Sequence, residues 1–302
     1  MNTEVKIAGV TFKNPVMDAS GTFGSGIEYS VFTDLNRLGA VVTKGVADHP
    51  WPGNPTPRVA ETPSGMMNAI GLQNPGIDVF IERDLKFLED YDTNVIVNVC
   101  GHSEEEYLNV VERLADEKRV DMLEINVSCP NVKEGGIAFG TRPEALLSIT
   151  EKIKKIAKQP VIMKLSPNVT SIADMAKAAE AGGADAISLI NTLTAMKIDI
   201  YKRKFALANK TGGLSGPAIR PVAVRMVYEA SHAVKIPVIG MGGIATGEDA
   251  IEFMMAGASA VAVGMYNFHD PTAMIRVIDE IEKFMQKTGV EDINDLVGCV
   301  DV

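Results

Sequence analysis

The residue best suited to chemistry in this sequence is a cysteine. Cys129 lies in the segment Asn126-Val-Ser-Cys-Pro-Asn131, and the glycine pair Gly135-Gly136 follows it. A thiol beside a proline and ahead of two glycines is typical of a loop, where a cysteine can react, and not of a packed core. Cys129 is therefore a candidate reactive thiol, and an incidental loop thiol is the alternative.

The other cysteines and the histidines form no second chemical pattern. Cys100 ends an apolar run and Cys299 lies in an apolar tail, so both are expected to pack as small hydrophobic side chains. Three widely spaced cysteines fit neither a disulfide framework nor a zinc site, and they cannot fill a four-cysteine iron–sulfur site. Because the four histidines lack metal-ligand spacing, no metal site is predicted.

Glycines mark a possible anion site. The segment Gly242-Gly-Ile-Ala-Thr246 leads from an apolar run into a predicted helix, and Gly264 follows the next apolar run. Glycines let the backbone approach an anion closely, and N–H groups at a helix start bind phosphate. The pattern predicts a phosphorylated ligand or cofactor. The first strand is followed by Ala19–Gly26, which does not match G-x-G-x-x-G, and no Walker segment occurs.

Polar and glycine residues also collect where the apolar runs finish. Each one alone fits a turn residue or a solvated lysine, but two lysines and three asparagines that converge on one rim indicate a ligand site. In chain order these residues are Ser20-Gly21, Lys44-Gly45, Asn98, Asn126, Lys164, Asn191-Thr192, Gly242-Gly243 and Gly264-Met265.

Such a rim requires a framework that brings many strand ends together. Short β-branched runs alternate with amphipathic stretches along the chain, which is typical of a parallel sheet covered by helices. Eight repeats predict an α/β fold, a (β/α)8 TIM barrel formed by residues 1–302 as a single domain, with a doubly wound open sheet as the alternative. Val5–Ile7 and Val10–Phe12 predict an N-terminal β-hairpin. The predicted strands are Pro15–Asp18, Ala40–Thr43, Asn94–Val99, Met122–Asn126, Val161–Leu165, Ala186–Ile190, Pro237–Met241 and Ala260–Val263.

Helix starts and long connections complete this framework. Ser103 with Glu106 and Thr141 with Glu144 fit the capping box, and Asp270-Pro271 fits an N-cap followed by a proline at the first helical position. Long βα-loop insertions follow three of the strands, so they are expected to cover the C-terminal face of the barrel. These insertions are Gly45–Gly76, Val127–Gly140 and Asn191–Gly216.

Charge and composition exclude some functions. Lys and Arg number 29 and Asp and Glu number 39, so the formal charge is 29 − 39 = −10, without the basic stripe that nucleic-acid binding needs. No apolar run approaches the ~18 residues of a membrane helix. The N-terminal segment MNTEVKIAGVTFKNP also lacks the layout of a signal peptide. A cytoplasmic protein without membrane association is expected.

Several motifs in collinear order, between about Val5 and Asn267, resemble the class 1 dihydroorotate dehydrogenases. The most specific is Glu124–Gly136, which contains Asn126, Cys129 and the glycine pair. The catalytic subunit of the NAD-linked class 1B enzyme is the most similar member. The other motifs are Asn68–Gly76, Lys164–Asn168, Asn191-Thr192, Gly213–Gly216 and Gly240–Ile244.

The resemblance implies an enzyme that oxidises dihydroorotate to orotate in pyrimidine (UMP) biosynthesis. It implies that Cys129 removes the C5 proton while the C6 hydride passes to N5 of FMN, one FMN per chain. The implied FMN-binding residues are Ser20, Lys44, Gly45, Asn98, Asn126, Lys164, Ile190, Gly216, Gly242, Gly243, Gly264 and Met265. The implied substrate-binding residues are Lys44, Asn68, Ala69, Ile70, Gly71, Leu72, Asn126, Asn191 and Thr192.

The resemblance also implies a partner. The class 1B pattern is suggested by Asn68–Gln73 and Lys133–Gly136, whereas class 1A relatives are homodimers that use fumarate. The chain has no dinucleotide fingerprint and too few cysteines for a cluster. We therefore expect a second subunit that carries FAD and a 2Fe-2S centre, in a heterotetramer with two barrels. The apolar tail Val297–Val300 is a candidate contact.

Two other functions stay open at this point. A dihydropyrimidine dehydrogenase-like flavoprotein would share the barrel and the cysteine loop but would act on uncharged uracil or thymine rings. A non-catalytic barrel that binds a phosphorylated metabolite would need no intact Cys129. Turnover of dihydroorotate but not of dihydrouracil would decide against the dihydropyrimidine dehydrogenase-like enzyme. The colour of the purified protein would distinguish a flavoprotein from the non-catalytic barrel.

Overall fold

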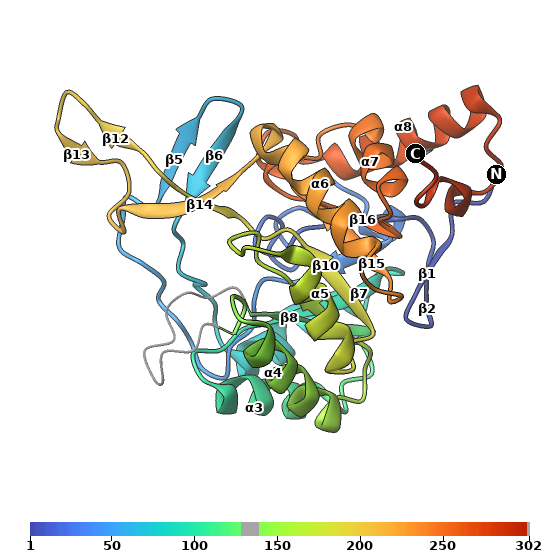
Figure 1. The fold of residues 1–302 in the computed structure, drawn as a ribbon. Coiled ribbons are helices and arrows are strands. Elements are labelled where there is room, and N and C mark those ends of the chain that lie inside the picture. The colour runs from blue at the N-terminus through green and yellow to red at the C-terminus, as the bar shows by residue number, and fades with distance from the viewer. Residues whose placement is uncertain (128–138, 301–302) are drawn as a thin grey trace.

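The computed structural model describes residues 1–127 and 139–300 and contains a closed barrel of eight parallel strands (Figure 1). Each strand pairs with the next barrel strand along the chain, and the last pairs with the first. The predicted barrel is confirmed, and every predicted strand end lies within one residue of the observed one. The strands are β3 (Val16–Asp18), β4 (Ala40–Val42), β7 (Asn94–Val99), β8 (Met122–Asn126), β9 (Val161–Lys164), β10 (Ala186–Leu189), β15 (Val238–Met241) and β16 (Ala260–Val263).

The barrel strands are apolar because both of their faces are covered. All residues of β15 and β16 are buried, as are those of β9 and β10. Such strands appear as continuous apolar runs without polar alternation, which is why the sequence located them well.

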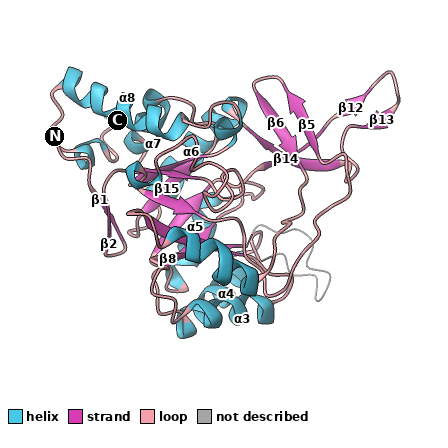
Figure 2. Ribbon diagram, turned by 180° about the vertical axis from the view of Figure 1, so that it is seen from behind, coloured by secondary structure: helices cyan, strands magenta, loops and turns pink. Residues whose placement is uncertain are grey.

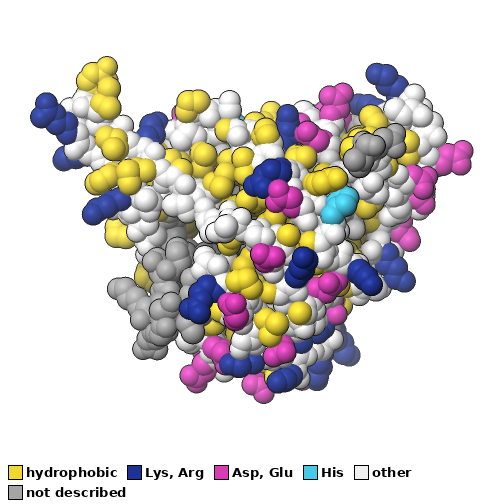
Figure 3. Space-filling view, in the orientation of Figure 1, with side chains coloured by type: hydrophobic (Ala, Val, Ile, Leu, Met, Phe, Trp, Pro, Cys, Tyr) yellow, Lys and Arg dark blue, Asp and Glu magenta, His cyan; other side chains and the backbone are white. Residues whose placement is uncertain are grey.

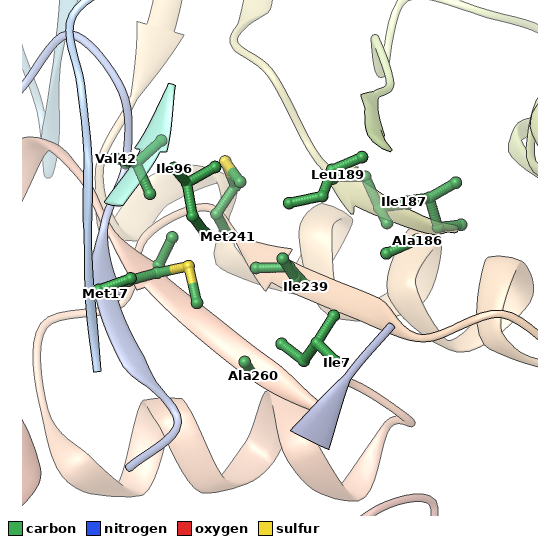
Figure 4. Packing of buried hydrophobic residues seen from close by; sticks show 14 of the residues in the cluster. Ile7, Met17, Val42, Ile96, Ala186, Ile187, Leu189, Ile239, Met241 and Ala260 are labelled. Atoms are coloured by element: carbon green, nitrogen blue, oxygen red, sulfur yellow. The ribbon is translucent and has the colours of Figure 1, made fainter. Parts of the chain in front are cut away.

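The predicted hairpin of β1 (Val5–Ile7) and β2 (Val10–Phe12) is also confirmed. Its buried Ile7 packs with Met17, Ile239 and Ala260, near the points where their strands begin (Figure 4). The hairpin therefore covers the N-terminal end of the barrel and leaves the opposite end for a site.

Helices surround the strands (Figure 2). The first strand is an exception to the predicted alternation, because turns and a short 3-10 helix, η1 (Leu35–Arg37), follow it. The α-helices are α1 (Ile77–Val79), α2 (Lys86–Leu88), α3 (Glu104–Leu114), α4 (Pro143–Ile156), α5 (Ile172–Ala181), α6 (Arg220–Ser231), α7 (Gly247–Met255) and α8 (Ala273–Thr288). A π-helix, η2 (Phe80–Leu85), joins α1 to α2, and further 3-10 helices are η3 (Pro217–Ile219), η4 (Met265–Phe268) and η5 (Ile293–Leu296).

The predicted cap at the start of α3 is only half formed. The Ser103 hydroxyl accepts from the Glu106 N–H at 3.3 Å, but the Glu106 carboxylate accepts from the His102 N–H at 2.6 Å and not from Ser103.

The other two predicted helix starts are wrong. At α4 the N-cap is Arg142, one residue later than predicted, because the residue before a proline is disfavoured in helical conformation and Arg142 is extended. At α8 the N-cap is Thr272, two residues later than the predicted Asp270. Asp270 accepts from the Thr272 N–H within the preceding turn, at 2.9 Å.

The first and third insertions form a sheet of their own, which the sequence did not predict. This insertion sheet is antiparallel in the order β11-β14-β6-β5, so the two strands of the third insertion lie beside the two strands of the first. Its strands are β5 (Val59–Thr62), β6 (Gly65–Asn68), β11 (Leu193–Met196) and β14 (Thr211–Ser215). A small hairpin, β12 (Ile198–Asp199) with β13 (Lys204–Phe205), extends from it (Figure 1).

The tip around this hairpin is apolar and basic (Figure 3). Ile200 is 72% exposed and Tyr201 is 93% exposed. Lys202, Arg203 and Lys204 follow directly in the chain. Exposed apolar side chains among charges are typical of a contact surface.

Within residues 1–127 and 139–300, no helix combines the length and apolar character needed to cross a membrane.

Candidate active site

Most of the predicted site residues that the structure describes lie at the carboxyl ends of the barrel strands, from which the insertions also leave. The exceptions are Asn68–Leu72 and Gly216, which end or follow strands of the insertion sheet. The Ser20 hydroxyl donates to the Thr43 carbonyl at 2.8 Å, so the ends of β3 and β4 are held together. Lys44 Nζ lies 3.5 Å from the point that a Cβ on Gly21 would occupy. The lysine after β4 therefore reaches back across the end of β3.

Two predicted asparagines meet at the ends of β8 and β10. Asn191 Nδ2 donates to Asn126 Oδ1 at 3.2 Å, and Asn191 Oδ1 accepts from the Thr192 N–H at 2.8 Å. The Tyr107 hydroxyl of α3 donates to the Asn126 carbonyl at 2.7 Å. This fixes the end of β8 directly before the cysteine segment, so three of the predicted substrate contacts lie together.

A buried glutamate, which the sequence reasoning did not select, organises two further predicted residues. Glu124 Oε1 accepts from Asn98 Nδ2 at 2.6 Å and from Lys164 Nζ at 3.2 Å. Glu124 Oε2 accepts from the Ser188 hydroxyl at 2.7 Å. Glu124 and Lys164 are 2% and 4% exposed. A charged residue within the apolar run Met122–Asn126 was the signal that could have revealed this network.

The residues around Asn98 fit the flavin ring that the resemblance implies. Asn98 Oδ1 is buried and has no hydrogen-bond partner among the described residues. It lies 3.0 Å from the point that a Cβ on Gly45 would occupy. Buried polar atoms are normally paired, so an unpaired amide oxygen at a strand end suits a ligand that brings an N–H donor, as a flavin ring does.

Glycines bring the backbone segments of the predicted phosphate corner close together. A Cβ on Gly216 would collide with the Met265 side chain, and one on Gly243 would lie 2.7 Å from the Gly216 carbonyl oxygen. Ile190 Cγ1 would be 3.3 Å from a Cβ on Gly242. Both Gly216 and Gly243 also have positive φ, +107° and +83°, so glycine is required there.

The helix start beside this corner does not offer the N–H groups that the sequence reasoning expected. Asp249 accepts from the Ala245 and Thr246 N–H groups at 2.9 and 3.0 Å, and Glu280 accepts from the Gly247 N–H at 2.6 Å. These donors are already paired with the chain's own carboxylates. An anion would instead meet the N–H groups of Gly242 and Gly243, which donate to no acceptor in residues 1–127 and 139–300.

The predicted substrate segment Asn68–Leu72 leaves the insertion sheet at the end of β6. Asn68 is paired in register with Gly213 of β14. Asn54 holds the next residues, because its Nδ2 donates to the Ala69 carbonyl at 3.0 Å and its N–H donates to the Ile70 carbonyl at 2.9 Å. Leu72 packs against the buried cluster of Ala47, Trp51 and Cys100.

Two ionisable groups at this end of the barrel have shifted pKa values. Burial lowers the pKa of Lys44, and the charges of Lys164 and Arg58 lower it further, while Cys100 opposes the shift. Burial raises the pKa of Asp18 well above its usual value, and the negative charge of Glu124 adds to this rise against the hydrogen bond from the Val42 N–H. Lys44 thus loses its proton more easily than an ordinary lysine, and Asp18 loses its proton less easily than an ordinary aspartate.

The remaining thiols and the cysteine segment complete the comparison with the sequence. Cys100 is buried, as predicted, but Cys299 is exposed, so its predicted packing is wrong. Cys129, Lys133 and Gly135-Gly136 lie outside the described residues. Their roles therefore stay predictions.

Comparison with known proteins identifies relatives of the whole chain. Residues 2–285 match the family described as dihydroorotate dehydrogenase. The "Dihydroorotate dehydrogenase B (NAD(+)), catalytic subunit" of Lachnoclostridium phytofermentans is 69% identical over 300 residues, covering 99% of this chain and 100% of that protein. The protein of the same name from Thermoanaerobacter pseudethanolicus is 56% identical over the full length of both chains.

A solved structure has the same fold. The dihydroorotate dehydrogenase of Eimeria tenella, crystallised in complex with ferulenol, superposes with a TM-score of 0.82 at 25% identity. The match covers 98% of this chain and 88% of that chain.

Proposed function

The chain belongs to the dihydroorotate dehydrogenase family, class 1B, and we propose that it oxidises dihydroorotate to orotate in pyrimidine synthesis and passes the electrons to NAD through a partner subunit. One observation carries this proposal beyond family membership. Lys44, Asn126 and Asn191 lie at the carboxyl ends of their strands, beside a buried network that contains Lys164. Enzymes with this barrel place their reacting groups at that end.

The proposed cofactor is FMN, held by the twelve residues named above for it. Two observations support this assignment: the buried Asn98 Oδ1 is an unpaired acceptor that the ring could use, and the N–H groups of Gly242 and Gly243 are unpaired donors for a phosphate among the described residues. When bound, FMN supplies the hydride acceptor. The buried ammonium of Lys164 stabilises negative charge that develops beside it during reduction.

The proposed substrate contacts follow from the chemistry of dihydroorotate. Its carboxylate matches the Lys44 ammonium, and the N–H and C=O groups of its ring match the amides of Asn126 and Asn191. Thr192 and the Asn68–Leu72 segment, which belong to the insertions, are the further proposed contacts of the substrate. Cys129, as a thiolate, is the proposed base that takes the C5 proton.

The test of this function is anaerobic mixing of the purified protein with dihydroorotate. We expect heat to release about one FMN per chain from the purified protein. In the intact protein, we expect the visible absorption of the bound flavin to bleach on mixing with dihydroorotate but not with dihydrouracil. Bleaching by dihydrouracil alone would support a dihydropyrimidine dehydrogenase-like enzyme. FAD, or a colourless protein, would refute the cofactor assignment.

Lys44→Ala is expected to raise the KM for dihydroorotate about 10-fold or more, because a charge-assisted hydrogen bond is lost. In the wild type the lowered Lys44 pKa means that this charge disappears earlier as pH rises, so KM should increase toward alkaline pH. Lys44→Arg keeps its charge and should flatten that increase. Steady-state KM values across the alkaline range check this, and an unchanged KM in Lys44→Ala would favour a solvated rim lysine.

The proposed partner is an electron-transfer subunit that carries FAD and a 2Fe-2S centre, in a heterotetramer with two copies of each chain. The words "catalytic subunit" in the names of the relatives support a partner. We expect the isolated chain to reduce artificial dyes with dihydroorotate but to form NADH only after the partner is added. NADH formation or fumarate-dependent turnover by the chain alone would show that the subclass is wrong.

A further inference from the structure

Glu124 lies inside the barrel and interacts with residues of three other strands. It is on β8, Asn98 is on β7, Lys164 on β9 and Ser188 on β10. The parallel registers place Asn98 opposite Glu124, and Lys164 opposite Ser188. Four consecutive strands of the barrel therefore meet at one carboxylate, close below the mouth.

The carboxylate sets the orientation of the Asn98 amide. Asn98 Nδ2 donates to Glu124 Oε1 at 2.6 Å, so Oδ1 is the amide atom that remains for a ligand. If a donor replaced Glu124 Oε1, the reverse orientation of the Asn98 amide would be favoured, and Nδ2 would be the atom that remains for the ligand. An N–H donor on the ligand would then meet a second donor.

The carboxylate also neutralises the Lys164 ammonium. The Nζ and Oε1 atoms are 3.2 Å apart, and both side chains are at most 4% exposed. Lys44 is a further cation in this region; burial lowers its pKa, and repulsion by the charge of Lys164 lowers it further. Among the described residues, Glu124 is the carboxylate that forms an ion pair with Lys164.

From these contacts, and on the basis of the function proposed above, we infer that Glu124 is a positioning residue for the flavin. It keeps Asn98 Oδ1 facing the ring and limits the positive charge that Lys164 presents to it. Neither role requires Glu124 to contact the flavin or the substrate.

Two substitutions of Glu124 separate the two roles. Glu124→Gln keeps an acceptor for Asn98 and Lys164, and the Ser188 hydroxyl can turn to accept from the new amide, so only the charge is lost. We expect the flavin potential to become more positive, and sulfite, which adds to electron-poor flavins, to bind about 10-fold more tightly, because uncompensated charge acts strongly in a buried site. Glu124→Asp keeps the charge but withdraws the carboxylate by about 1.5 Å. For this variant we expect a flavin potential near that of the wild type and an FMN Kd raised about 10-fold.

Glu180→Gln is the matched control. The Glu180 carboxylate likewise accepts a hydrogen bond, from the Lys235 N–H at 2.7 Å, but Glu180 lies on the outer helix α5, so its variant should retain wild-type potential and sulfite Kd. Lower melting temperatures for both Glu124 variants, with unchanged potential, sulfite Kd and FMN Kd, would show a purely structural role and overturn the inference. If Glu124→Gln does not fold, the FMN Kd of Glu124→Asp decides alone. A wild-type protein that binds no FMN would refute the proposed function instead.

Discussion

Cys129→Ala should slow the reduction of bound flavin by dihydroorotate at least ~10²-fold at neutral pH, the usual scale for loss of a general base. The content of FMN should stay the same, because the thiol is not among the proposed FMN contacts. Anaerobic stopped-flow absorption measures the rate directly. Cys129→Ser should retain slight activity that rises at higher pH, since a hydroxyl loses its proton at a much higher pH than a thiol, whose ordinary pKa is ~8.5.

The control for this prediction is Cys299→Ala. Cys299 is exposed and lies near the C-terminus, so its removal should leave the reduction rate at the wild-type value. Near-normal flavin reduction by Cys129→Ala would exclude the thiol as the base.

Lys164→Met should lower the free energy of unfolding by about 3–5 kcal/mol, because it leaves the Glu124 carboxylate buried without its counter-ion. Bound FMN should also be lost. Urea unfolding at neutral pH, followed by circular dichroism, gives the stability. Lys154→Met is the matched control, since the Lys154–Asp185 ion pair is partly exposed and should be worth no more than about 1 kcal/mol.

A double substitution distinguishes charge from packing. Lys164→Met with Glu124→Leu removes both charges, and apolar replacement of a buried ion pair is often nearly neutral for stability. We expect most of the stability to return and FMN binding to remain absent. A double variant as unstable as Lys164→Met alone would contradict the unpaired-charge explanation.

The sequence located the barrel well because its strands are buried on both faces. Runs such as Ala260–Val263 are wholly apolar, so their position depends little on tertiary context. The rim residues followed from the strand ends, since parallel strands present their carboxyl ends on one side.

Other features depended on contacts between distant segments. β14 contains Gly212 and Gly213, which weaken any strand signal, and it forms only because β6 and β11 lie on either side. Glu124 stood in a motif that resembles the family, but its role rests on Asn98, Lys164 and Ser188, which lie between 26 and 64 residues away in sequence. The spacing of residues in the sequence does not indicate such distant partners.

The pairing of the two insertions in one sheet restricts how this enzyme can be altered. β6, from the first insertion, is hydrogen-bonded to β14, from the third, and proposed substrate contacts leave from both segments. A chimera that takes only one insertion from a relative would join strands whose facing residues did not evolve together. Inherited or engineered changes in substrate preference should therefore transfer between relatives only when residues 45–76 and 191–216 are exchanged as a pair.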